Sequence, residues 1–304
     1  MILNERYIIK VPASSANLGP GFDSIGIAVD LFLTLEVEKA VEWRFFTENE
    51  ELSQFPRGED HFICQVAQKT AGKFGGNLHP CKVKMESDIP LARGLGSSAA
   101  AIIAGIELAD LAAGLGLTKQ EKLEIATDME GHPDNVGASL YGGLVVGCYQ
   151  QEQVDLLAFS NLQFEMVALI PREILLTKES RKVLPDIFSY GKAVQASATA
   201  NLLVAALLSE NWETAGKMMR LDHFHQPYRK PLIPFYGETE KRALCEGAFG
   251  VALSGAGPTL LCFTEKGQGK RLARQLQGEF PQMQAKLLQI ENHGSVVCKL
   301  EEAV

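Results

Sequence analysis

The sequence predicts a two-domain α+β protein. The chain has 304 residues, which is long enough for two domains, and its apolar residues recur with strand spacing in some segments and helix spacing in others. The organisation of the chain changes near residue 155. We therefore expect an N-terminal domain over residues 1–155 and a C-terminal domain over residues 156–304.

Composition is typical of an ordinary globular protein, with 22% charged residues, 46% hydrophobic residues and a net charge of −8. No basic run is interleaved with aromatic residues, which argues against nucleic acid as a partner. No signal-peptide pattern or apolar run of transmembrane length is visible, so no membrane partner is expected. Six scattered cysteines without a C-x-x-C pair indicate buried free thiols and a cytoplasmic protein.

The first part of the chain is expected to form strands over residues 6–11 and 31–37. Residues 12–23 lie between them and are rich in Gly, Pro, Ser and Asn, so we expect a long functional loop there. The pattern then predicts a helix over residues 60–74 and a short strand over residues 82–85.

The most informative stretch is PLARGLGSSAAA, residues 90–101. Gly94 and Gly96 permit a tight turn and the close approach of a ligand, and the apolar run after them predicts a helix. The N-terminus of such a helix offers free N–H groups to an anion, and Ser97 and Ser98 add hydroxyls. We interpret this stretch as a triphosphate cradle; the alternatives are a dinucleotide-binding loop and a purely structural turn.

A second informative stretch, EGHPDNV at residues 130–136, follows a helix expected over residues 118–130. An acidic residue at the end of a helix opposes the helix dipole, so Glu130 is expected to serve another purpose, such as binding magnesium. The alternative is that the polar residues beside it only make turn hydrogen bonds; they are His132, Asp134 and Asn135.

A strand is expected over residues 144–149 at the end of the first domain, and another over residues 164–170 at the start of the second. Residues 174–185 then open a mostly helical region, with helices expected over residues 194–208 and 212–219.

Residues 250–263, GVALSGAGPTLLCF, predict a hairpin whose glycine turn can lie against a ligand. A basic helix over residues 266–276 and a closing strand over residues 294–300 follow.

The DHFH run at residues 222–225 has too few ligands for a metal site, and we interpret its histidines as polar surface. Arg229 lies between two prolines, in an expected rigid turn.

Taken together and in this order, these stretches resemble the signature motifs of the GHMP kinase superfamily, and in particular the homoserine kinase family. The matching segments are VPASSANLGPGFDSIGIAVDL (11–31), PLARGLGSSAA (90–100), EGHPDNV (130–136), TKESRKVLP (177–185) and LSGAGPT (253–259). The resemblance implies an α+β, two-domain GHMP kinase fold, with a ribosomal protein S5 domain 2-like N-terminal domain and a ferredoxin-like C-terminal domain.

The resemblance also implies an activity, the ATP-dependent phosphorylation of the side-chain hydroxyl of L-homoserine to O-phospho-L-homoserine in threonine biosynthesis. Two alternatives are another GHMP kinase for a mevalonate-like or sugar substrate, and a non-catalytic nucleotide and metabolite sensor. The first motif lacks the lysine of mevalonate-type relatives, and an intact Glu130 argues against a sensor. The assembly is left open between a monomer and a homodimer.

Homologous positions imply the site residues. ATP would be held by Pro90, Leu91, Ala92, Arg93, Gly94, Leu95, Gly96, Ser97, Ser98, Ala99 and Ala100. Homoserine would be held by Asn17, Asp23, His132, Thr177, Arg181, Arg229 and Gly255, and Mg²⁺ by Ser98 and Glu130. A zwitterionic amino acid needs an acid for its ammonium group and an arginine for its carboxylate, which Asp23 with Arg181 or Arg229 would supply.

The catalytic residues are expected to be Glu130, Asp134 and Asn135, and the proton acceptor is left open. Either Asp134 takes the hydroxyl proton, or Asn135 only orients the γ-phosphate while the proton passes to phosphate or solvent. We favour the second mechanism.

Overall fold

The structure is a computed structural model that describes residues 5–300, and it contains two sheets. The first sheet consists of β1 (Arg6–Asn17), β2 (Gly21–Lys39), β3 (Arg44–Phe46), β4 (Cys81–Ser87), β5 (Leu144–Gln150), β6 (Gln153–Phe159) and β11 (Val296–Lys299). Its order is β11-β1-β2-β4-β3, and β5 joins it by pairing with β2 and β6. The first part of the long strand β2 pairs with β5, and its second part pairs with β4.

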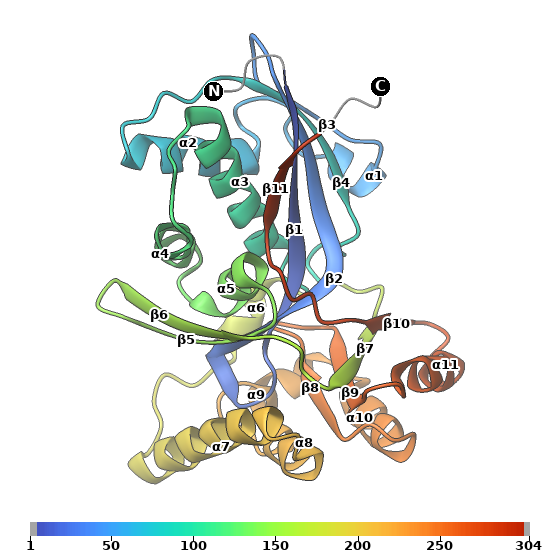
Figure 1. The fold of residues 1–304 in the computed structure, drawn as a ribbon. Helices are drawn as coiled ribbons and strands as arrows, with labels where there is room; N and C mark the ends of the chain where they lie inside the picture. Colours follow the sequence, from blue (N-terminus) through green and yellow to red (C-terminus); the bar gives the residue numbers. More distant parts are fainter. Residues whose placement is uncertain (1–4, 301–304) are drawn as a thin grey trace.

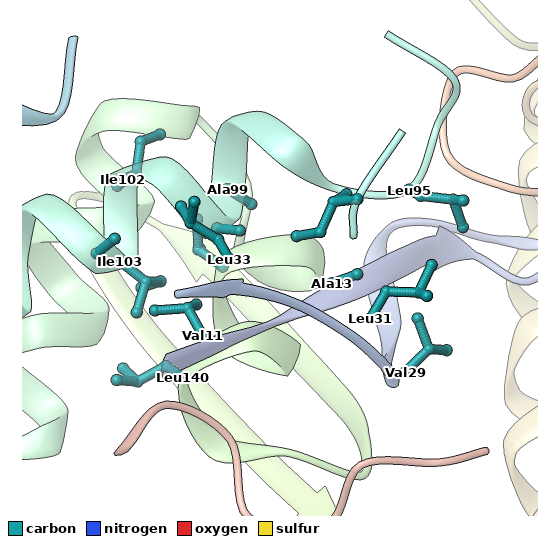
Figure 2. Close-up of a cluster of buried hydrophobic side chains, with 14 of the residues drawn as sticks. Val11, Ala13, Val29, Leu31, Leu33, Leu95, Ala99, Ile102, Ile103 and Leu140 are labelled. Carbon is teal, nitrogen blue, oxygen red and sulfur yellow. The ribbon is translucent and has the colours of Figure 1, made fainter. Parts of the chain in front are cut away.

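Five helices belong to this half of the chain: α1 (Glu50–Ser53), α2 (Phe62–Lys73), α3 (Ser97–Ala113), α4 (Lys119–Glu130) and α5 (Pro133–Tyr141). Figure 1 shows α2 to α5 on one side of the first sheet. Figure 2 shows the core between them, where Val11 and Leu33 of the strands pack near Ile102 and Ile103 of α3. Each fully buried aliphatic side chain of this kind stabilises the fold by about 1.5–3 kcal/mol.

The second sheet is antiparallel and runs in the order β10-β7-β9-β8. Its strands are β7 (Phe164–Ile170), β8 (Gly250–Leu253), β9 (Leu260–Glu265) and β10 (Gln284–Leu288). The helices of this half are α6 (Thr177–Lys182), α7 (Tyr190–Leu208), α8 (Trp212–Arg220), α9 (Gln226–Arg229), η1 (Lys230–Leu232), α10 (Tyr236–Cys245) and α11 (Gly269–Glu279). The order along this part of the chain is one strand, several helices, two strands, a helix and a strand, which is the ferredoxin-like order.

The sheet pairing bears on where the two domains divide. β6 spans residues 153–159 and pairs with β5, and β11 returns to pair with β1. The division at residue 155 remains a prediction, and the pairing favours a boundary between β6 and β7, with the last strand returning to the first sheet.

The prediction of a long loop over residues 12–23 is wrong, because β1 continues to Asn17 and β2 begins at Gly21. Ser14 and Ser15 are completely buried, and both have hydrogen-bond partners inside the protein. Small and polar residues fit this strand because other segments cover it closely, and the ladder shifts register directly after Pro12, which has no N–H to donate.

Two further local expectations need correction. Asp134 and Asn135, for which turn hydrogen bonds were the alternative, lie in the first turn of α5, because Pro133 begins that helix. Proline is favoured at the first helical position, where its missing N–H costs nothing. The rigid turn expected around Arg229 is the short helix α9 followed by η1.

Burial corrects two other interpretations. His225 is completely buried, so the DHFH run is not simply polar surface. All six cysteines are free, but Cys148, Cys245 and Cys298 are exposed. The apolar segment around Cys148 predicts a buried thiol, but this residue lies on the exposed face of β5.

The expectation that no apolar run approaches a membrane span also needs correction. Among residues 5–300, α7 is long and apolar enough to cross a membrane by length and composition alone, although one such helix is weak evidence. Ser197, Thr199 and Asn201 alternate with alanines in its middle, so the sequence shows no long unbroken apolar run.

A buried ion network fixes α4 against α3. Lys122 lies 2.7 Å from carboxylate oxygens of both Glu107 and Asp110, and Ser295 Oγ donates a hydrogen bond of 2.8 Å to Glu107. Buried charges are costly when a partner is lost, so this network strongly prefers one arrangement of the two helices. It thereby sets the position of Glu130 at the end of α4.

Candidate functional site

The predicted site residues meet in a cavity of about 240 Å³ between the two sheets, called the central cavity below. The cavity is surrounded by the tip of the β1–β2 hairpin, the N-termini of α3 and α5, the helices α6 and α9, and the loop of residues 254–259. Its lining comprises Ala16, Asn17, Phe22, Asp23, Ala92, Gly94, Gly96, Ser97, Ser98, Ala99, Glu130, His132, Asp134, Asn135, Leu175, Leu176, Thr177, Arg181, Arg229, Gly255 and Ala256.

The N-terminus of α3 opens into the central cavity. Its N-cap is Gly96, which has a left-handed conformation (φ 69°) and offers no side chain to cap the helix. The uncapped N–H groups of a 17-residue helix and the positive end of its dipole form a site for an anion. Ser97 and Ser98 lie in the first turn and line the cavity, so phosphate is the natural ligand here.

The two glycines of this loop are needed for contact with the protein itself. A Cβ at Gly94 would overlap the carbonyl oxygen of Ser254 and lie 3.0 Å from the backbone nitrogen of Gly257. A Cβ at Gly96 would overlap Ser14 Oγ and lie 2.8 Å from the carbonyl oxygen of Ser14. Close packing of the protein itself is therefore one reason for glycine at these positions. Both glycines also line the central cavity, and the expected close approach of a ligand stays a prediction.

The tip of the β1–β2 hairpin places two polar side chains at the cavity. Asn17 and Asp23 have positive φ angles of 75° and 55°, a strained conformation that is concentrated at functional sites. Asn17 Nδ2 donates to the carbonyl oxygen of Gly255 (3.1 Å), and its Oδ1 accepts from the Asp23 N–H (3.0 Å). The amide of Asn17 thus holds Asp23 in place and ties the hairpin to the loop of residues 254–259.

Asp23 and Arg181 form a two-pronged ion pair, with N–O distances of 2.7 and 3.1 Å. Both side chains are partly exposed to the cavity, and the Arg181 guanidinium lies 5.3 Å from the centre of the Phe22 ring. Asp23 and Arg181, which were expected to bind the ammonium and carboxylate groups of a zwitterion, are therefore in direct contact with each other. A ligand with both charges can exchange with this pair.

Arg229 is buried, and no carboxylate lies within 4.0 Å of it among residues 5–300. Its Nε donates to the carbonyl oxygen of Ser180 (3.1 Å), and Nη1 donates to that of Gly255 (2.9 Å). Burial first, and then repulsion by Arg181, lowers the pKa of Arg229 to about 10, which still leaves it charged at neutral pH. A buried cation without a counter-ion is costly, so this position calls for an anionic ligand.

The start of α5 contributes three polar residues. His132 Nδ1 lies 2.5 Å from Asp134 Oδ1, which also accepts the N–H of Asn135 (2.7 Å). Burial opposes the charged imidazole, but the hydrogen bond and charge of Asp134 outweigh it and raise the pKa of His132. Asp134 is 1% exposed, and its Oδ2 has no hydrogen-bond partner within the described part of the chain. Ser14 Oγ donates to Asn135 Oδ1 (3.0 Å).

Two sets of side chains in the cavity offer ligands for a metal ion. Burial raises the pKa of Glu130, and the nearby Ser98 side chain partly offsets this. Ser98 and Glu130, the expected magnesium ligands, thus lie together beside the N-terminus of α3. Asp23, His132 and Asp134 also offer ligand atoms that lie within 4.8 Å of one another.

A second cavity of about 400 Å³ lies on the other side of the first turn of α3 and shares Ser97 and Ser98 with the central cavity. Its lining is mostly apolar and is made by Leu33, Leu52, Phe55, Pro56, Asp60, His61, Phe62, Ile63, Met85, Ser87, Ile89, Leu91, Ser97, Ser98 and Ala101. We call it the apolar cavity. Its size and character suit a flat, weakly polar group such as a nucleobase.

One histidine of the apolar cavity has a defined proton position. Burial lowers the pKa of His61 to about 4, so the ring is neutral at physiological pH. Its Nδ1 accepts the N–H of Ile63 (3.2 Å), which leaves the proton on Nε2. The ring stacks on Phe45 with 4.2 Å between centroids.

Most of the predicted site residues line the central cavity, and the exceptions belong to the glycine motif. Leu95 and Ala100 are buried in the core, where Figure 2 labels Leu95, and Leu91 lines the apolar cavity. Pro90 and Arg93 lie in a groove facing the second sheet. Arg93 donates to the carbonyl oxygens of Leu91, Pro171 and Arg172, at 3.0–3.1 Å.

Several residues of the site are not predicted by the sequence. Phe22 lies within the first motif, but an apolar ring there gives no sign of stacking with two arginines. His225 lies four residues before Arg229, a spacing that predicts contact on a helix. His61 gives no signal because a helix N-cap residue is not distinguished from any other polar residue by hydrophobic spacing.

Comparison with known families gives two matches that together cover more than half of the chain. The family model described as the GHMP kinases N terminal domain matches residues 61–143, and the one described as GHMP kinases C terminal matches residues 203–282. A curated protein named homoserine kinase, from Bacillus licheniformis, is 50% identical over 291 residues, which are 96% of this chain and 95% of that one.

Solved structures confirm the predicted two-domain α+β fold. A Listeria monocytogenes structure provisionally assigned as homoserine kinase has a TM-score of 0.83 and 38% identity, covering 96% of this chain and 99% of the other. The homoserine kinase of Cytophaga hutchinsonii has a TM-score of 0.86, covering 98% and 99%. At 24% identity the second likeness supports the fold alone.

We predict that Gly96→Val lowers both ATP affinity and stability. The new side chain would displace Ser14, which holds Asn135, so the substitution disturbs the packing behind the site as well as the loop itself. Unfavourable φ and overpacking together should cost about 2–4 kcal/mol in urea unfolding. Titration calorimetry with ATP would measure the change in affinity.

Gly116→Val is the matched control for Gly96→Val. Gly116 has a similar φ of 68°, but no atom lies within 4 Å of the place that a Cβ would take, so only backbone strain of about 1–2 kcal/mol is expected. ATP affinity should be unchanged. Equal stability losses in the two variants, with ATP affinity lost only at Gly96, would contradict the collision with Ser14 and favour a direct contact with phosphate.

Proposed function

We propose, because the chain belongs to the homoserine kinase family of the GHMP kinases, that it phosphorylates the side-chain hydroxyl of L-homoserine with ATP, a step of threonine biosynthesis. The observation that best supports this substrate is the buried guanidinium of Arg229, which has no carboxylate partner among residues 5–300, together with the ion pair of Asp23 and Arg181. A zwitterionic amino acid supplies the carboxylate that Arg229 lacks and an ammonium group for Asp23.

The binding roles follow from which groups the protein itself leaves unsatisfied. Arg229 takes the substrate carboxylate together with Arg181, and Asp23 takes the ammonium group. The remaining expected contacts lie around these charges in the central cavity: Asn17, His132, Thr177 and Gly255. Asn17 acts mainly by holding Asp23 and Gly255, because its oxygen and one N–H already bind them.

Arg229→Met is predicted to raise the homoserine KM by roughly tenfold to a hundredfold, the value of a charge-assisted hydrogen bond, and to leave the ATP KM nearly unchanged. An amino alcohol without the carboxylate should be a much poorer substrate for the wild type and only slightly poorer for the variant. Arg181→Met should show the same carboxylate dependence, together with weaker ammonium binding through Asp23.

Steady-state kinetics with homoserine, serine, threonine and mevalonate separates the two parts of this proposal. Faster turnover of mevalonate than of homoserine by the wild type would contradict the proposed substrate. Equal losses with homoserine and with the amino alcohol in Arg229→Met would show that Arg229 does not bind the carboxylate.

ATP is proposed to bind across the first turn of α3. The uncapped N–H groups and the hydroxyls of Ser97 and Ser98 bind its phosphates, and the apolar cavity on the other side of this turn takes the base. The γ-phosphate then points into the central cavity, where the substrate hydroxyl lies. This arrangement supplies the positioning and charge stabilisation on which phosphoryl transfer depends.

Ser98 and Glu130 fit a magnesium ion, because a hydroxyl and one carboxylate beside bound phosphates are the donors that Mg²⁺ prefers. Bound there, Mg²⁺ would neutralise charge on the phosphates. Glu130 lies at the end of α4, where the helix dipole does not favour a negative charge, and a bound cation there would favour the ionised carboxylate.

Glu130→Gln is predicted to lower kcat by roughly 10²–10³-fold and to change the homoserine KM far less, because the lost charge acts at the transferred phosphate. The Mg²⁺ concentration for half-maximal rate should also rise. Glu124→Gln on the exposed side of the same helix is the control and should leave both quantities unchanged. Equal losses of affinity for both substrates would indicate a structural role for Glu130.

The proton step involves Asn135 and Asp134. We propose that Asn135, held through its oxygen by Ser14, presents its amide N–H groups to the γ-phosphate, and that the hydroxyl proton passes to phosphate. The unpartnered Oδ2 of Asp134 accepts a hydrogen bond from the substrate hydroxyl and orients it. The same atom makes Asp134 the second candidate, as a general base.

Kinetics of Asp134→Asn distinguish these roles. Loss of one orienting hydrogen bond predicts a fall in kcat of about tenfold, whereas loss of a general base predicts roughly 10²–10⁴-fold. Asn135→Ala is expected to have the larger effect of the two. A fall of several hundredfold in Asp134→Asn, with unchanged substrate KM values, would make Asp134 the base.

We also infer a homodimer and a cytoplasmic location. α7 exposes an apolar face that includes Tyr190, Val194 and Leu202, and Figure 1 shows this helix at the edge of the molecule. We propose that a second copy of this chain covers this apolar face. The mass in solution should then be that of a dimer for the wild type and that of a monomer for Leu202→Lys. Six free thiols are consistent with a reducing compartment.

A further inference from the structure

We propose that His225 is a positioning residue that holds the guanidinium of Arg229 in the orientation needed by the substrate carboxylate. This inference rests on the proposed function, in which Arg229 binds that carboxylate. It assigns a specific task to a completely buried polar side chain that the reaction itself does not use.

The two ring nitrogens of His225 have different partners. Nε2 lies 2.8 Å from the carbonyl oxygen of Gly19 and 3.4 Å from Oδ2 of the buried Asp222, and Nδ1 lies 3.2 Å from Nη1 of Arg229. A guanidinium only donates hydrogen bonds, so Nδ1 must accept and Nε2 must hold the proton. The ring therefore links Arg229 to the hairpin tip that presents Asn17 and Asp23.

The surroundings of His225 allow the ring little freedom. The carboxylate of Asp222 accepts the backbone N–H groups of Phe224, His225 and Gln226, at 2.7, 3.2 and 2.7 Å. The ring stacks on Phe22 with 5.4 Å between centroids, and the Arg229 guanidinium lies 5.3 Å from the same Phe22 ring. Backbone and ring are thus both fixed, and so is the direction of the acceptor Nδ1.

The neutral state of the ring is required for this task. Burial first, and then the positive charge of Arg229, lowers the pKa of His225 to about 3. A protonated ring would offer a donor to Arg229 instead of an acceptor. A phenylalanine ring of similar size would fill the same space but would leave Nη1 of Arg229 with only the Gly255 carbonyl oxygen.

Two conservative variants separate the two hydrogen bonds. The side-chain oxygen of His225→Asn can stand near the position of Nδ1 and accept from Arg229, while the Gly19 bond is lost. The side-chain nitrogen of His225→Gln can stand near the position of Nε2 and donate to Gly19, while the acceptor for Arg229 is lost.

His225→Gln should raise the homoserine KM about tenfold, the value of one hydrogen bond, with kcat and the ATP KM nearly unchanged. His225→Asn should keep the homoserine KM close to wild type and lower the melting temperature instead. His225→Phe should raise the KM at least as much as His225→Gln. His223→Gln, two residues away, is the matched control and should change neither quantity.

Combining His225→Gln with Arg229→Met tests whether His225 acts through Arg229. The double variant should show no higher homoserine KM than Arg229→Met alone, and the amino alcohol without a carboxylate should not distinguish His225→Gln from the wild type. Equal KM increases in His225→Asn and His225→Gln, or a parallel rise in the ATP KM, would overturn the inference. Failure of the wild type to phosphorylate homoserine would instead overturn the proposed function.

Discussion

The contact between the loop of residues 254–259 and the first sheet holds both halves of the site together. The Ser254 hydroxyl lies 2.8 Å from Ser15 Oγ and 2.5 Å from the carbonyl oxygen of Gly94. The Gly255 N–H donates to the carbonyl oxygen of Ala16 (3.1 Å), and the Gly255 carbonyl oxygen accepts from Asn17 and Arg229. These bonds bring side chains from both sheets to one cavity.

Two buried polar groups of the central cavity, on Arg229 and Asp134, are not fully satisfied by the described part of the protein, and this costs folding free energy. Burying a charge or a carboxylate oxygen without a partner costs several kcal/mol in an apolar environment. Arg229 has no carboxylate near it among the described residues, and Asp134 Oδ2 accepts no hydrogen bond. Under the proposed function, a substrate with a carboxylate and a hydroxyl would remove both costs, and part of its binding energy would come from satisfying these two groups.

The residue types of a motif do not by themselves indicate how its members act. In the glycine loop, Gly94 and Gly96 make room for the protein's own backbone, and Leu95 packs in the core. In the first motif, Ser14 and Ser15 bind other parts of the protein, and Asn17 braces Asp23. Many motif residues therefore act by packing behind the cavity, and this packing fixes the side chains that line it.

The amino-acid sequence by itself determined the features that depend on neighbours along the chain. The capping box of α4, the helix after the glycine loop and the strand–turn–strand of β8 and β9 were predicted because spacing and turn residues act locally. Most residues that the motifs singled out also line the central cavity, although each motif is a separate continuous run of residues.

Only the tertiary structure decided which of these residues are buried and what they touch. The Ser-rich segment is a strand because α3, α5 and the loop of residues 254–259 cover it, and His225 is a buried partner of Arg229 because the hairpin tip closes over it. Burial and pairing of this kind join segments up to 239 residues apart. Local spacing cannot report such contacts, because the free energy of a polar group depends on what surrounds it in space.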